Sequence, residues 1–402
     1  MQIKKKMKIG IIKEGKCPPD KRVPLSPEQC KYIVHNYPSV SIYVQSSNIR
    51  CFNDEEYVNN GVEVVDELSC CDIILGVKEV PIDMLLNNKV FLFFSHTIKK
   101  QPYNKELLKQ IINKNIQLID YETLVYDSGK RVLGFGRYAG IIGAYNTFLA
   151  YGLKTKKYNL SVAHKLSNKS QLDSQLINVS LPSNFKIILT GEGRVAQGAQ
   201  EILKILNIKK VSKNDFLNKN FNFPVYVQLL PSDYYVRNHQ ILFDKKDFYQ
   251  KPDDYKSCLN DFVIYADMLI TGHYHAPNNP FLLSKEDLKK NKKLKVIGDI
   301  SCDINGPIGS TIRPSTISEP IYGYNRITGL EDDLNQDDVI AVMAVDNLPC
   351  SLPKDASVDF GSVLIQKVLP ELISNGDITS RGTITKNGKL TKRFSYLSDY
   401  IA

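Results

Sequence analysis

The first third of the chain alternates short apolar runs with amphipathic segments. Met7–Lys13 has the composition of a strand, and Ser39–Gln45 and Gly61–Val65 alternate apolar with polar residues. Cys71–Val77 and Val90–Ser95 are continuous apolar runs, which are typical of strands covered on both faces. This pattern predicts an α/β region with a mostly parallel sheet.

Helix signals separate these runs. Ser26 stands directly before Pro27 and three residues before Gln29, which is the arrangement of an N-cap, a first-turn proline and a capping box. Asn104–Ile112 is predicted to be a helix, and it leads into a further predicted strand at Ile116–Tyr121. The succession of strand and helix therefore continues to residue 121.

The residues after 135 predict a second unit of the same kind. Gly136–Leu153 is long, apolar and rich in small residues, so we expect a helix that connects two domains. Lys154–Pro182 is polar and serine-rich and predicts a surface excursion, whereas Pro231–Lys256 predicts a loop with one helix. The other expected elements are a C-terminal helix at Ala356–Ser374 and strands at Phe185–Thr190, Lys209–Ser212, Met268–Gly272, Leu294–Ile300 and Val339–Val345.

A glycine-rich turn joins the predicted strand Phe185–Thr190 to an apolar-periodic segment. Gly191, Gly193 and Ala196 form the pattern G-x-G-x-x-A. In this setting the first glycine permits a tight turn, the second lets the backbone approach a pyrophosphate, and the small third residue lets helix and strand pack closely. The helix N-terminus would face the phosphates. The motif indicates dinucleotide binding, although an ordinary strand-to-helix turn has the same letters.

The fold class that follows is α/β with two Rossmann-like domains, each a mostly parallel sheet with helices on both faces, and an interdomain cleft. A chain of 402 residues is too long for one typical core. We expect an N-terminal catalytic and substrate domain at residues 1–136, joined by residues 345–402. Residues 137–344 are expected to form the dinucleotide-binding domain.

The net charge of +9 comes from lysines that are scattered and often lie beside asparagine. This distribution favours a solvated surface over a nucleic-acid stripe, and it suits a small polyanionic substrate. No apolar run is long enough to span a membrane, and eight irregularly spaced cysteines without C-x-x-C indicate free thiols in a reducing cytoplasm. We expect a cytoplasmic monomer or small homo-oligomer that binds neither nucleic acid, membrane nor metal.

Two predicted strands of the first domain end in ionisable residues. Lys78 follows the run that ends at Val77, and His96 follows the run that ends at Ser95. Ligands of open α/β sheets bind at the carboxyl ends of strands, where a desolvated lysine can act as a base and a histidine can exchange protons near neutral pH. Each residue alone is more often a solvated or structural group. Their joint position makes them candidate catalytic residues.

The chain also carries groups that suit anionic and nucleotide ligands. The cations of the first domain fit a substrate with several carboxylates, although a plain surface distribution would look alike. These cations are Arg22, Lys99, Lys130 and Arg131. Asp299 and Ser301 follow a late strand, where they would contact nicotinamide or ribose, or cap a turn. The acidic ribose ligand of NAD-binding units is not evident at Ser212, and Lys210 and Lys213 leave NADP open.

The chain resembles the alanine dehydrogenase/transhydrogenase superfamily, and within it the lysine-forming saccharopine dehydrogenases. The resemblance runs over nearly the whole chain. Its segments are Lys21–Pro27, Gly76–Pro81, Ser95–Gln101, Tyr121–Glu122, Lys130–Gly136, Tyr138–Gly140, Gly191–Arg194, Asp299–Asp303 and Asp346–Ser357. The first three are shared across the superfamily, whereas the last two are more specific to the saccharopine branch.

The resemblance implies oxidation of the secondary amine of saccharopine by hydride transfer to a nicotinamide, followed by hydrolysis of the imine to lysine and 2-oxoglutarate. It implies that Lys78 is the base for the amine and that His96 handles the protons of the water steps. The implied substrate contacts are Arg22, Lys99, Gln101, Glu122, Arg131, Phe135 and Tyr274. The implied cofactor contacts are Lys130, Gly191, Gly193, Arg194, Val195, Ser212, His273, Asp299, Ile300, Ser301 and Asp303.

Three alternatives stay open. Another amino-acid dehydrogenase, such as alanine dehydrogenase, would share the superfamily segments, and the reductase that condenses lysine with 2-oxoglutarate would use the same pair of substrates. A dinucleotide-binding protein without catalysis would keep the glycine turn alone. The family commonly has arginine where this chain has Lys130, and this departure bears on cofactor choice more than on reaction class. NAD is the expected cofactor and a polycarboxylate amino acid the expected partner, with NADP as the alternative.

Overall fold

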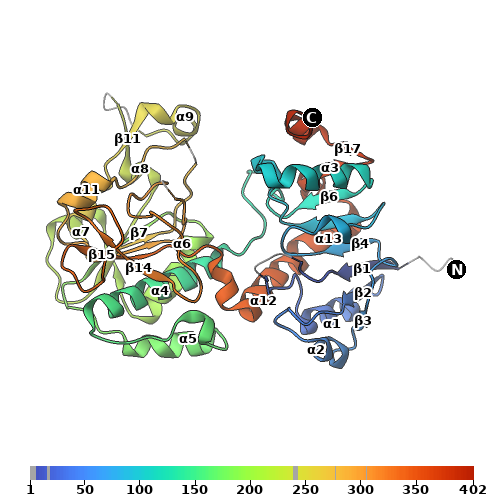
Figure 1. Ribbon diagram of the computed structural model, residues 1–402, viewed down its shortest axis with the longest axis horizontal. Helices are drawn as coiled ribbons and strands as arrows, with labels where there is room; N and C mark the ends of the chain where they lie inside the picture. Colours follow the sequence, from blue (N-terminus) through green and yellow to red (C-terminus); the bar gives the residue numbers. More distant parts are fainter. Residues whose placement is uncertain (1–5, 16–18, 239–242, 277, 305) are drawn as a thin grey trace. The chain divides into compact units, whose positions relative to one another are not determined.

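The computed structural model describes residues 6–15, 19–238, 243–276, 278–304 and 306–402, and the chain divides into two compact units (Figure 1). Unit 1 consists of Met1–Phe135 and Pro353–Ala402, and unit 2 of Gly136–Leu352. Each unit has its own large sheet and its own buried apolar clusters. The predicted α/β class with mostly parallel sheets is confirmed.

An eight-stranded sheet forms the centre of unit 1, in the order β17-β16-β6-β5-β4-β1-β2-β3. Strands β1 to β6 are paired in parallel, while β16 and β17 add an antiparallel edge that the sequence pattern does not predict. The predicted strands of the first third are all present, each with shorter bounds than predicted. The strands are β1 Met7–Ile11, β2 Val40–Gln45, β3 Glu63–Val65, β4 Ile73–Leu75, β5 Val90–Phe93, β6 Gln117–Asp120, β16 Thr383–Lys386 and β17 Lys389–Leu390.

The first helix of unit 1 begins where its capping signal predicts. The capping box of α1 is formed, because the backbone N–H of Gln29 donates to Ser26 Oγ at 3.3 Å and the N–H of Ser26 donates to Gln29 Oε1 at 2.9 Å. The predicted C-terminal helix is present as α12 and α13, joined by a π-helical turn at Leu364–Val368. The α-helices are α1 Pro27–Asn36, α2 Asp54–Asn59, α3 Lys105–Asn113, α12 Pro353–Val363, α13 Leu369–Ser374, α14 Asp377–Gly382 and α15 Ser398–Ile401. Figure 1 shows this red C-terminal segment beside the blue and teal strands of the same unit.

A seven-stranded sheet forms the centre of unit 2, in the order β14-β15-β13-β12-β7-β9-β8. All neighbouring strands are parallel except β14, which pairs antiparallel with β15. The sequence pattern does not predict β9 or β14, and β14 has Gly323 at its centre. The strands are β7 Lys186–Thr190, β8 Lys209–Lys210, β9 Val225–Leu229, β12 Met268–Thr271, β13 Val296–Asp299, β14 Ile321–Asn325 and β15 Val339–Met343.

Two segments predicted as loops are more ordered than expected. Lys154–Pro182 contains α5, Lys169–Gln175, whose Leu172 is fully buried. Pro231–Lys256, described except for residues 239–242, contains α8 and α9 and most of a hairpin of β10, Tyr235–Arg237, with β11, Tyr255–Ser257. Helices this short owe their stability to tertiary packing, so little periodicity marks them in the sequence. The α-helices of unit 2 are α4 Gly136–Thr155, α5, α6 Arg194–Ile205, α7 Lys213–Asn218, α8 Pro231–Tyr234, α9 Lys245–Gln250, α10 Asn260–Val263 and α11 Lys285–Lys290.

Helices α4 and α6 approach each other at the level of their backbones. A Cβ atom on Gly140 would lie 1.9 Å from the carbonyl oxygen of Val195, and one on Gly198 would lie 2.0 Å from that of Arg137. Helix α4 also contacts β13 and β15, so it anchors α6 to the sheet. The N-terminus of α6, which follows the glycine-rich turn, is thereby held in place.

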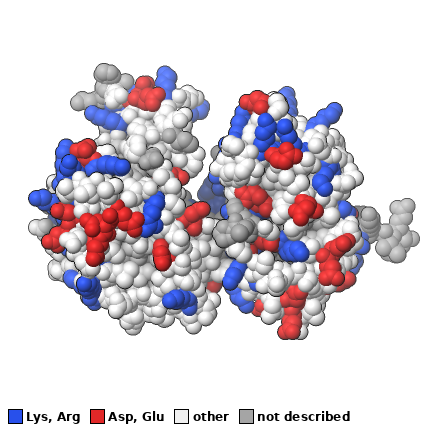
Figure 2. Space-filling view, viewed as in Figure 1, with Lys and Arg blue, Asp and Glu red and all other residues white. Residues whose placement is uncertain are grey.

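The surface and the cysteines agree with the composition. Figure 2 shows lysine and arginine side chains dispersed over the face in view and interspersed with acidic groups, without a continuous basic stripe. The seven cysteines within the described residues are free thiols, and Cys17 lies outside those residues. In the part of the chain that is described, the helices fall short of the length and apolarity needed to cross a bilayer.

The contact between α4 and α6 makes a prediction about Gly198. Replacing a glycine by alanine within a helix ordinarily stabilises it by about 1 kcal/mol. At this position the overlap with Arg137 outweighs that gain, and we expect Gly198→Ala to lower the free energy of unfolding by about 1–3 kcal/mol. Urea unfolding measures the difference, and Gln197→Ala, on the exposed side of the same helix, is the matched control. A stabilised Gly198→Ala protein would contradict the close helix contact.

Candidate active site

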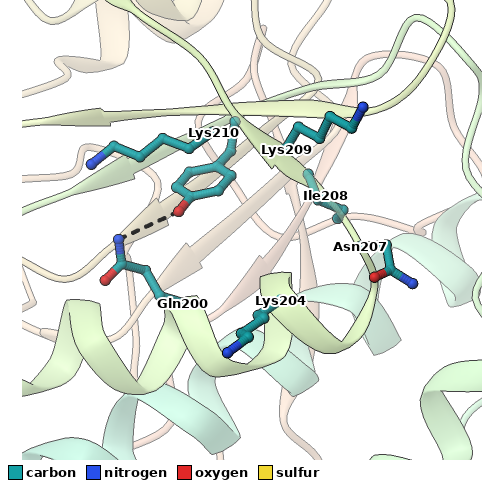
Figure 3. A pocket seen from close by; sticks show the side chains of 7 residues that line it. Gln200, Lys204, Asn207, Ile208, Lys209 and Lys210 are labelled. Carbon is teal, nitrogen blue, oxygen red and sulfur yellow. Dashed lines mark hydrogen bonds between the residues drawn. The ribbon is translucent and has the colours of Figure 1, made fainter.

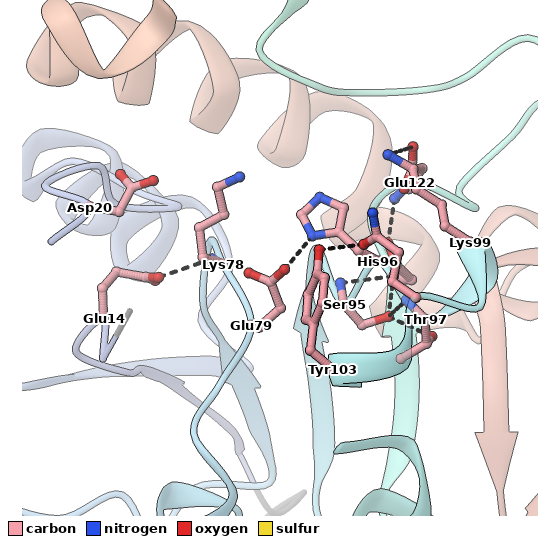
Figure 4. Close-up of polar contacts among 12 residues, drawn as sticks. Glu14, Asp20, Lys78, Glu79, Ser95, His96, Thr97, Lys99, Tyr103 and Glu122 are labelled. Carbon is pink, nitrogen blue, oxygen red and sulfur yellow. Dashed lines mark hydrogen bonds and ion pairs between the residues drawn. The ribbon is translucent and has the colours of Figure 1, made fainter. Parts of the chain in front are cut away.

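Four neighbouring strands of unit 1 end in the ionisable residues of the candidate site (Figure 4). Strands β6, β5, β4 and β1 are consecutive and parallel, so their carboxyl ends lie along one edge of the sheet. Glu14 follows β1, Lys78 and Glu79 follow β4, His96 follows β5, and Glu122 follows β6. The structure therefore places Lys78 and His96 at adjoining strand ends.

His96 is oriented by a carboxylate that the sequence analysis did not single out. Its Nδ1 lies 2.5 Å from Glu79 Oε1, and its ring is stacked 6.4 Å from that of Phe94. When Nδ1 carries the proton for this hydrogen bond, the lone pair of the neutral ring lies on Nε2. The backbone of His96 has a φ of 52°, a left-handed conformation that is uncommon outside glycine and recurs at functional sites. The available signal was the position of Glu79 directly after Lys78.

Glu14 was also missed, and it contacts the turn that carries Lys78. Its Oε1 accepts the backbone N–H of Val77 at 2.6 Å and its Oε2 accepts that of Lys78 at 2.9 Å. Burial raises the pKa of Glu14 to about 7, against the lowering effect of these two hydrogen bonds. A carboxyl group that titrates near neutral pH therefore lies beside the candidate base.

Arg22 is buried in an ion pair rather than standing alone as a cation. Its Nε donates to Asp20 Oδ1 at 3.0 Å, and its guanidinium lies 4.1 Å from the centroid of the Phe135 ring. Phe135 is stacked in turn on Phe360 at 4.5 Å. Burial raises the pKa of Asp20, but the charges and hydrogen bonds of Arg22, with the charge of Lys78, outweigh it and lower the pKa to about 2. Arg22 and Phe135, both predicted substrate contacts, thus form one rigid group.

Glu122 lies beside two more of the predicted cations. Its Oε1 lies 2.9 Å from Arg131 Nη2 and 3.9 Å from Lys99 Nζ. The buried Asp120 holds this strand end, because its carboxylate accepts the backbone N–H groups of Ser95 at 2.9 Å and of Glu122 at 2.7 Å. Burial raises the pKa of Asp120. Since the side chains of Arg131 and Lys99 are about half exposed, they can reach an anionic ligand from this position.

The structure does not bring every predicted ligand into this group. Gln101 follows the short helix after His96, and its Oε1 accepts a hydrogen bond from the hydroxyl of Tyr103. Lys130 is exposed, and its carbonyl closes a turn with the N–H of Tyr126 at 3.0 Å. Tyr274 belongs to unit 2 and is 73% exposed.

The glycine-rich turn of unit 2 has the geometry of a phosphate cradle. Gly191 has a φ of 86°, and a Cβ there would lie 2.5 Å from the carbonyl oxygen of Gly272. Gly193 is the N-cap of α6, and a Cβ there would meet nothing within 4 Å. Arg194 and Val195 form the first turn of a twelve-residue helix. The open space at Gly193 and the N–H groups of this helix fit the pyrophosphate of a dinucleotide.

His273 lies next to this turn. Its Nδ1 is 2.6 Å from Thr190 Oγ1, and its Nε2 is buried without a partner among the described residues. Burial, with the charge of His275, lowers the pKa of His273 to about 3. A neutral histidine with one unsatisfied ring nitrogen fits a polar ligand at the turn.

The residues predicted near the nicotinamide form a structural network. Asp299 is fully buried, and its Oδ1 accepts from the hydroxyls of Thr271 at 2.9 Å and Ser301 at 2.7 Å. Its Oδ2 accepts from Thr311 Oγ1 at 2.6 Å. The backbone of Ile300 donates to Thr271 Oγ1 at 2.9 Å. These are the turn-forming contacts that the sequence allowed as an alternative to ligand binding. Asp303 is exposed beyond the network.

A pocket of about 430 Å³ lies between α6, the edge strand β8 and its neighbour β9 (Figure 3). Its lining residues are Gln200, Lys204, Asn207, Ile208, Lys209, Lys210 and Tyr226. Lys210 Nζ donates to Gln228 Oε1 at 2.6 Å, and Gln228 Nε2 donates to the carbonyl of Gly191 at 2.8 Å, so the pocket is linked to the glycine turn. Ser212 caps α7 by accepting the N–H of Asp215 at 3.1 Å. The described residues contain no group of His, Cys, Asp or Glu that could hold a metal ion.

Comparison with known proteins extends these observations. Residues 10–142 match the family described as alanine dehydrogenase/PNT, N-terminal domain. The chain is 32% identical to α-aminoadipic semialdehyde synthase of Arabidopsis thaliana, over 89% of this chain but only 37% of that protein. It is 25% identical to the NAD(+)-dependent, L-lysine-forming saccharopine dehydrogenase of Emericella nidulans, over 90% of this chain and 91% of that one. The chain thus spans about two fifths of the first relatives that it matches.

A solved structure agrees on the fold. L-alanine dehydrogenase superposes with a TM-score of 0.62 at 16% identity, covering 98% of this chain and all of the other. The matched N-terminal family, the full-length resemblance to saccharopine dehydrogenase and the shared two-unit α/β fold point the same way. Residues 10–142 therefore match the alanine dehydrogenase/PNT N-terminal family, and over most of its length the chain is similar to the saccharopine dehydrogenases.

Proposed function

We propose that the protein is a nicotinamide-dinucleotide-dependent oxidoreductase that acts on the secondary amine of saccharopine, giving lysine and 2-oxoglutarate or running in reverse. The observation that carries the proposal is the placement of Lys78 and the His96–Glu79 pair at adjoining strand ends of unit 1. The relatives named saccharopine dehydrogenase support the substrate. We also propose a cytoplasmic location, on the ground of the free thiols.

The charges of unit 1 suit a substrate with three carboxylates and one amine. Lys99 and Arg131 stand beside Glu122, and their exposed cationic ends can pair with carboxylates. Arg22 is held by Asp20 and Phe135, so it would offer a guanidinium of fixed orientation. Alanine has a single carboxylate and could contact only one of these cationic groups through it.

In the proposed chemistry Lys78 takes the proton of the secondary amine as the substrate carbon is oxidised. A lysine can do so when its charge is disfavoured by burial or by nearby cations, and the side chain of Lys78 is partly buried at its strand end. His96, held by Glu79 at Nδ1, would give and take protons at Nε2 as water adds to the imine carbon and the amine leaves. Glu79 stabilises the charged ring that forms on protonation.

The dinucleotide would be held by unit 2 and would supply the hydride acceptor. Gly193, Arg194 and Val195 would contact the pyrophosphate, and His273 would offer its unsatisfied ring nitrogen. Asp299 would act by bracing the loop at Ile300 and Ser301. We propose NAD as the cofactor because the lysine-forming relatives are named as NAD(+) enzymes. Lys210, which points toward Gln228 at the glycine turn, keeps NADP as the alternative.

A second candidate function is the oxidation of saccharopine to α-aminoadipic semialdehyde and glutamate. It rests on the relatives named α-aminoadipic semialdehyde synthase, which are 31–32% identical to this chain. Saccharopine contains the carbon chain of this semialdehyde, and oxidation on the lysine side of its secondary amine yields the semialdehyde and glutamate. The condensation of lysine with 2-oxoglutarate is not a separate candidate, because it is the first proposed reaction run in reverse. The products therefore distinguish the candidates.

We predict that the purified protein consumes reduced nicotinamide when given lysine and 2-oxoglutarate, and that saccharopine accumulates. NADH and NADPH are compared in parallel by absorbance, and products are identified by mass spectrometry. With saccharopine and oxidised cofactor we expect lysine and 2-oxoglutarate. Turnover that requires pyruvate and ammonia would reject the proposal in favour of alanine dehydrogenase, and glutamate with the semialdehyde would select the second candidate.

Replacing the proposed base tests the chemical role of unit 1. We expect Lys78→Met to lower kcat by about 10²–10⁴-fold, because general base catalysis contributes a factor of this size. Binding of NADH, followed by its fluorescence, should stay within twofold. Lys292→Met, an exposed lysine of unit 2, is the control and should behave as wild type. A Lys78→Met enzyme with wild-type kcat would show that Lys78 is not the base of the reaction.

Gly193 gives a test of the dinucleotide site that leaves the fold intact. Because a Cβ at this position meets nothing within 4 Å, Gly193→Val should fold, with a melting temperature lowered only by the poorer N-cap that valine makes. The side chain would fill the space proposed for the pyrophosphate and remove a hydrogen bond to a charged group, which is worth about 1.5–3 kcal/mol. We expect the Kd for NADH to rise about 10–100-fold by calorimetry. Unchanged affinity would place the nucleotide elsewhere.

A further inference from the structure

Glu14 lies at the point where the pairing between β1 and β4 ends. Strand β1 stops at Ile11, and the last contact of this ladder runs from the N–H of Ile12 to the carbonyl of Leu75 at 3.0 Å. On the other side of β4, the N–H of Gly76 donates to Leu92 at 2.9 Å. Beyond this point β1 offers no backbone acceptor to the turn, and buried N–H groups need partners.

The carboxylate of Glu14 supplies those partners. Its two oxygens accept the consecutive N–H groups of Val77 and Lys78, at 2.6 and 2.9 Å. Figure 4 shows Glu14 beside the turn that carries Lys78. The carbonyl of Val77 accepts the N–H of Phe94 at 3.0 Å, which ties the same turn to the residues before His96. The backbone of the Lys78 turn is thereby fixed from both neighbouring strands.

We propose that Glu14 is a positioning residue for the reaction, in that its carboxylate replaces the missing end of β1 and fixes the backbone that carries Lys78. This inference rests on the proposed function for its catalytic meaning. Two adjacent N–H groups need two acceptor oxygens, which a glutamate has and a glutamine does not. An aspartate keeps the charge on a side chain one methylene shorter.

The surroundings of Glu14 make this support depend on pH. The negative charge of Asp20 raises the pKa of Glu14, and the positive charge of Arg22 lowers it. The buried hydroxyl of Tyr121 has no partner among the described residues, and its pKa is raised by burial and, to a smaller extent, by the charge of Glu14. Burial raises the pKa of Glu14 to about 7. Above this pH both oxygens accept hydrogen bonds, whereas below it one oxygen carries a proton and accepts poorly. The turn should therefore loosen as pH falls through 7.

Hydrogen exchange followed by mass spectrometry tests the placement without relying on turnover. We expect the amides of residues 76–80 to exchange at least about tenfold faster in Glu14→Gln than in wild type at pH 8, because a hydrogen bond to a charged group is lost. Glu14→Asp should fall between the two. In wild type the same amides should exchange faster, relative to their intrinsic rates, at pH 6 than at pH 8, and this difference should vanish in Glu14→Gln.

Kinetics test the role in the reaction. Glu14→Gln should lower kcat about tenfold or more while the KM for the nucleotide stays within twofold, and it should shift the acidic limb of the kcat profile. Asp267→Asn is the matched control, because Asp267 accepts the N–H of Lys186 at 3.0 Å by the same kind of contact in unit 2. It should lower stability without altering exchange at residues 76–80 or the pH profile.

The outcomes separate the two proposals. If the amides of residues 76–80 exchange in Glu14→Gln at the wild-type rate, the positioning role is overturned, whether or not the enzyme turns over. Faster exchange with unchanged kcat and pH profile would reduce Glu14 to a structural residue and overturn the inference as well. Absence of turnover in wild type with every substrate pair would reject the proposed function, while the exchange result would still decide where Glu14 acts.

Discussion

Parallel pairing of β6, β5, β4 and β1 is the constraint on which the candidate site depends. Neighbouring parallel strands place their carboxyl ends side by side, so residues 14, 78, 96 and 122, which are far apart in the chain, lie at one edge of the sheet. The ladder also fixes the distances along that edge, since neighbouring strands are about 4.8 Å apart. Any change in the strand order would separate the groups that we propose to work together.

Acidic partners fix the positions of the basic side chains at this edge of the sheet. Asp20 holds Arg22, Glu79 holds His96 and Glu122 gathers Arg131 and Lys99. Each carboxylate orients a positive or titratable group, which lowers the entropy lost when a substrate binds. The pKa values reflect this arrangement, because Asp20 is shifted down by its cations and Glu14 is shifted up by burial.

Unit 2 depends on a different constraint, the close packing of backbones. Gly140 and Gly198 let α4 and α6 touch, Gly191 turns where a side chain would collide with Gly272, and Gly193 keeps space at the helix N-terminus. The same residue type therefore serves two purposes here. At the first three positions glycine is required by the fold, whereas at Gly193 the fold tolerates a side chain and a bound phosphate would not.

The sequence by itself determined the class of fold, the strands β1 to β6, the capping of α1 and the glycine turn, because these features are set by local periodicity, propensity and short motifs. It also placed Lys78 and His96 at strand ends, and their catalytic roles stay predictions. Tertiary structure alone decided that β9 belongs to the second sheet, that β16 and β17 extend the first, and that Glu79 contacts His96 while Glu14 accepts the backbone N–H of Lys78. These features join residues distant in the chain, and single-sequence periodicity carries no information about which distant segments pair.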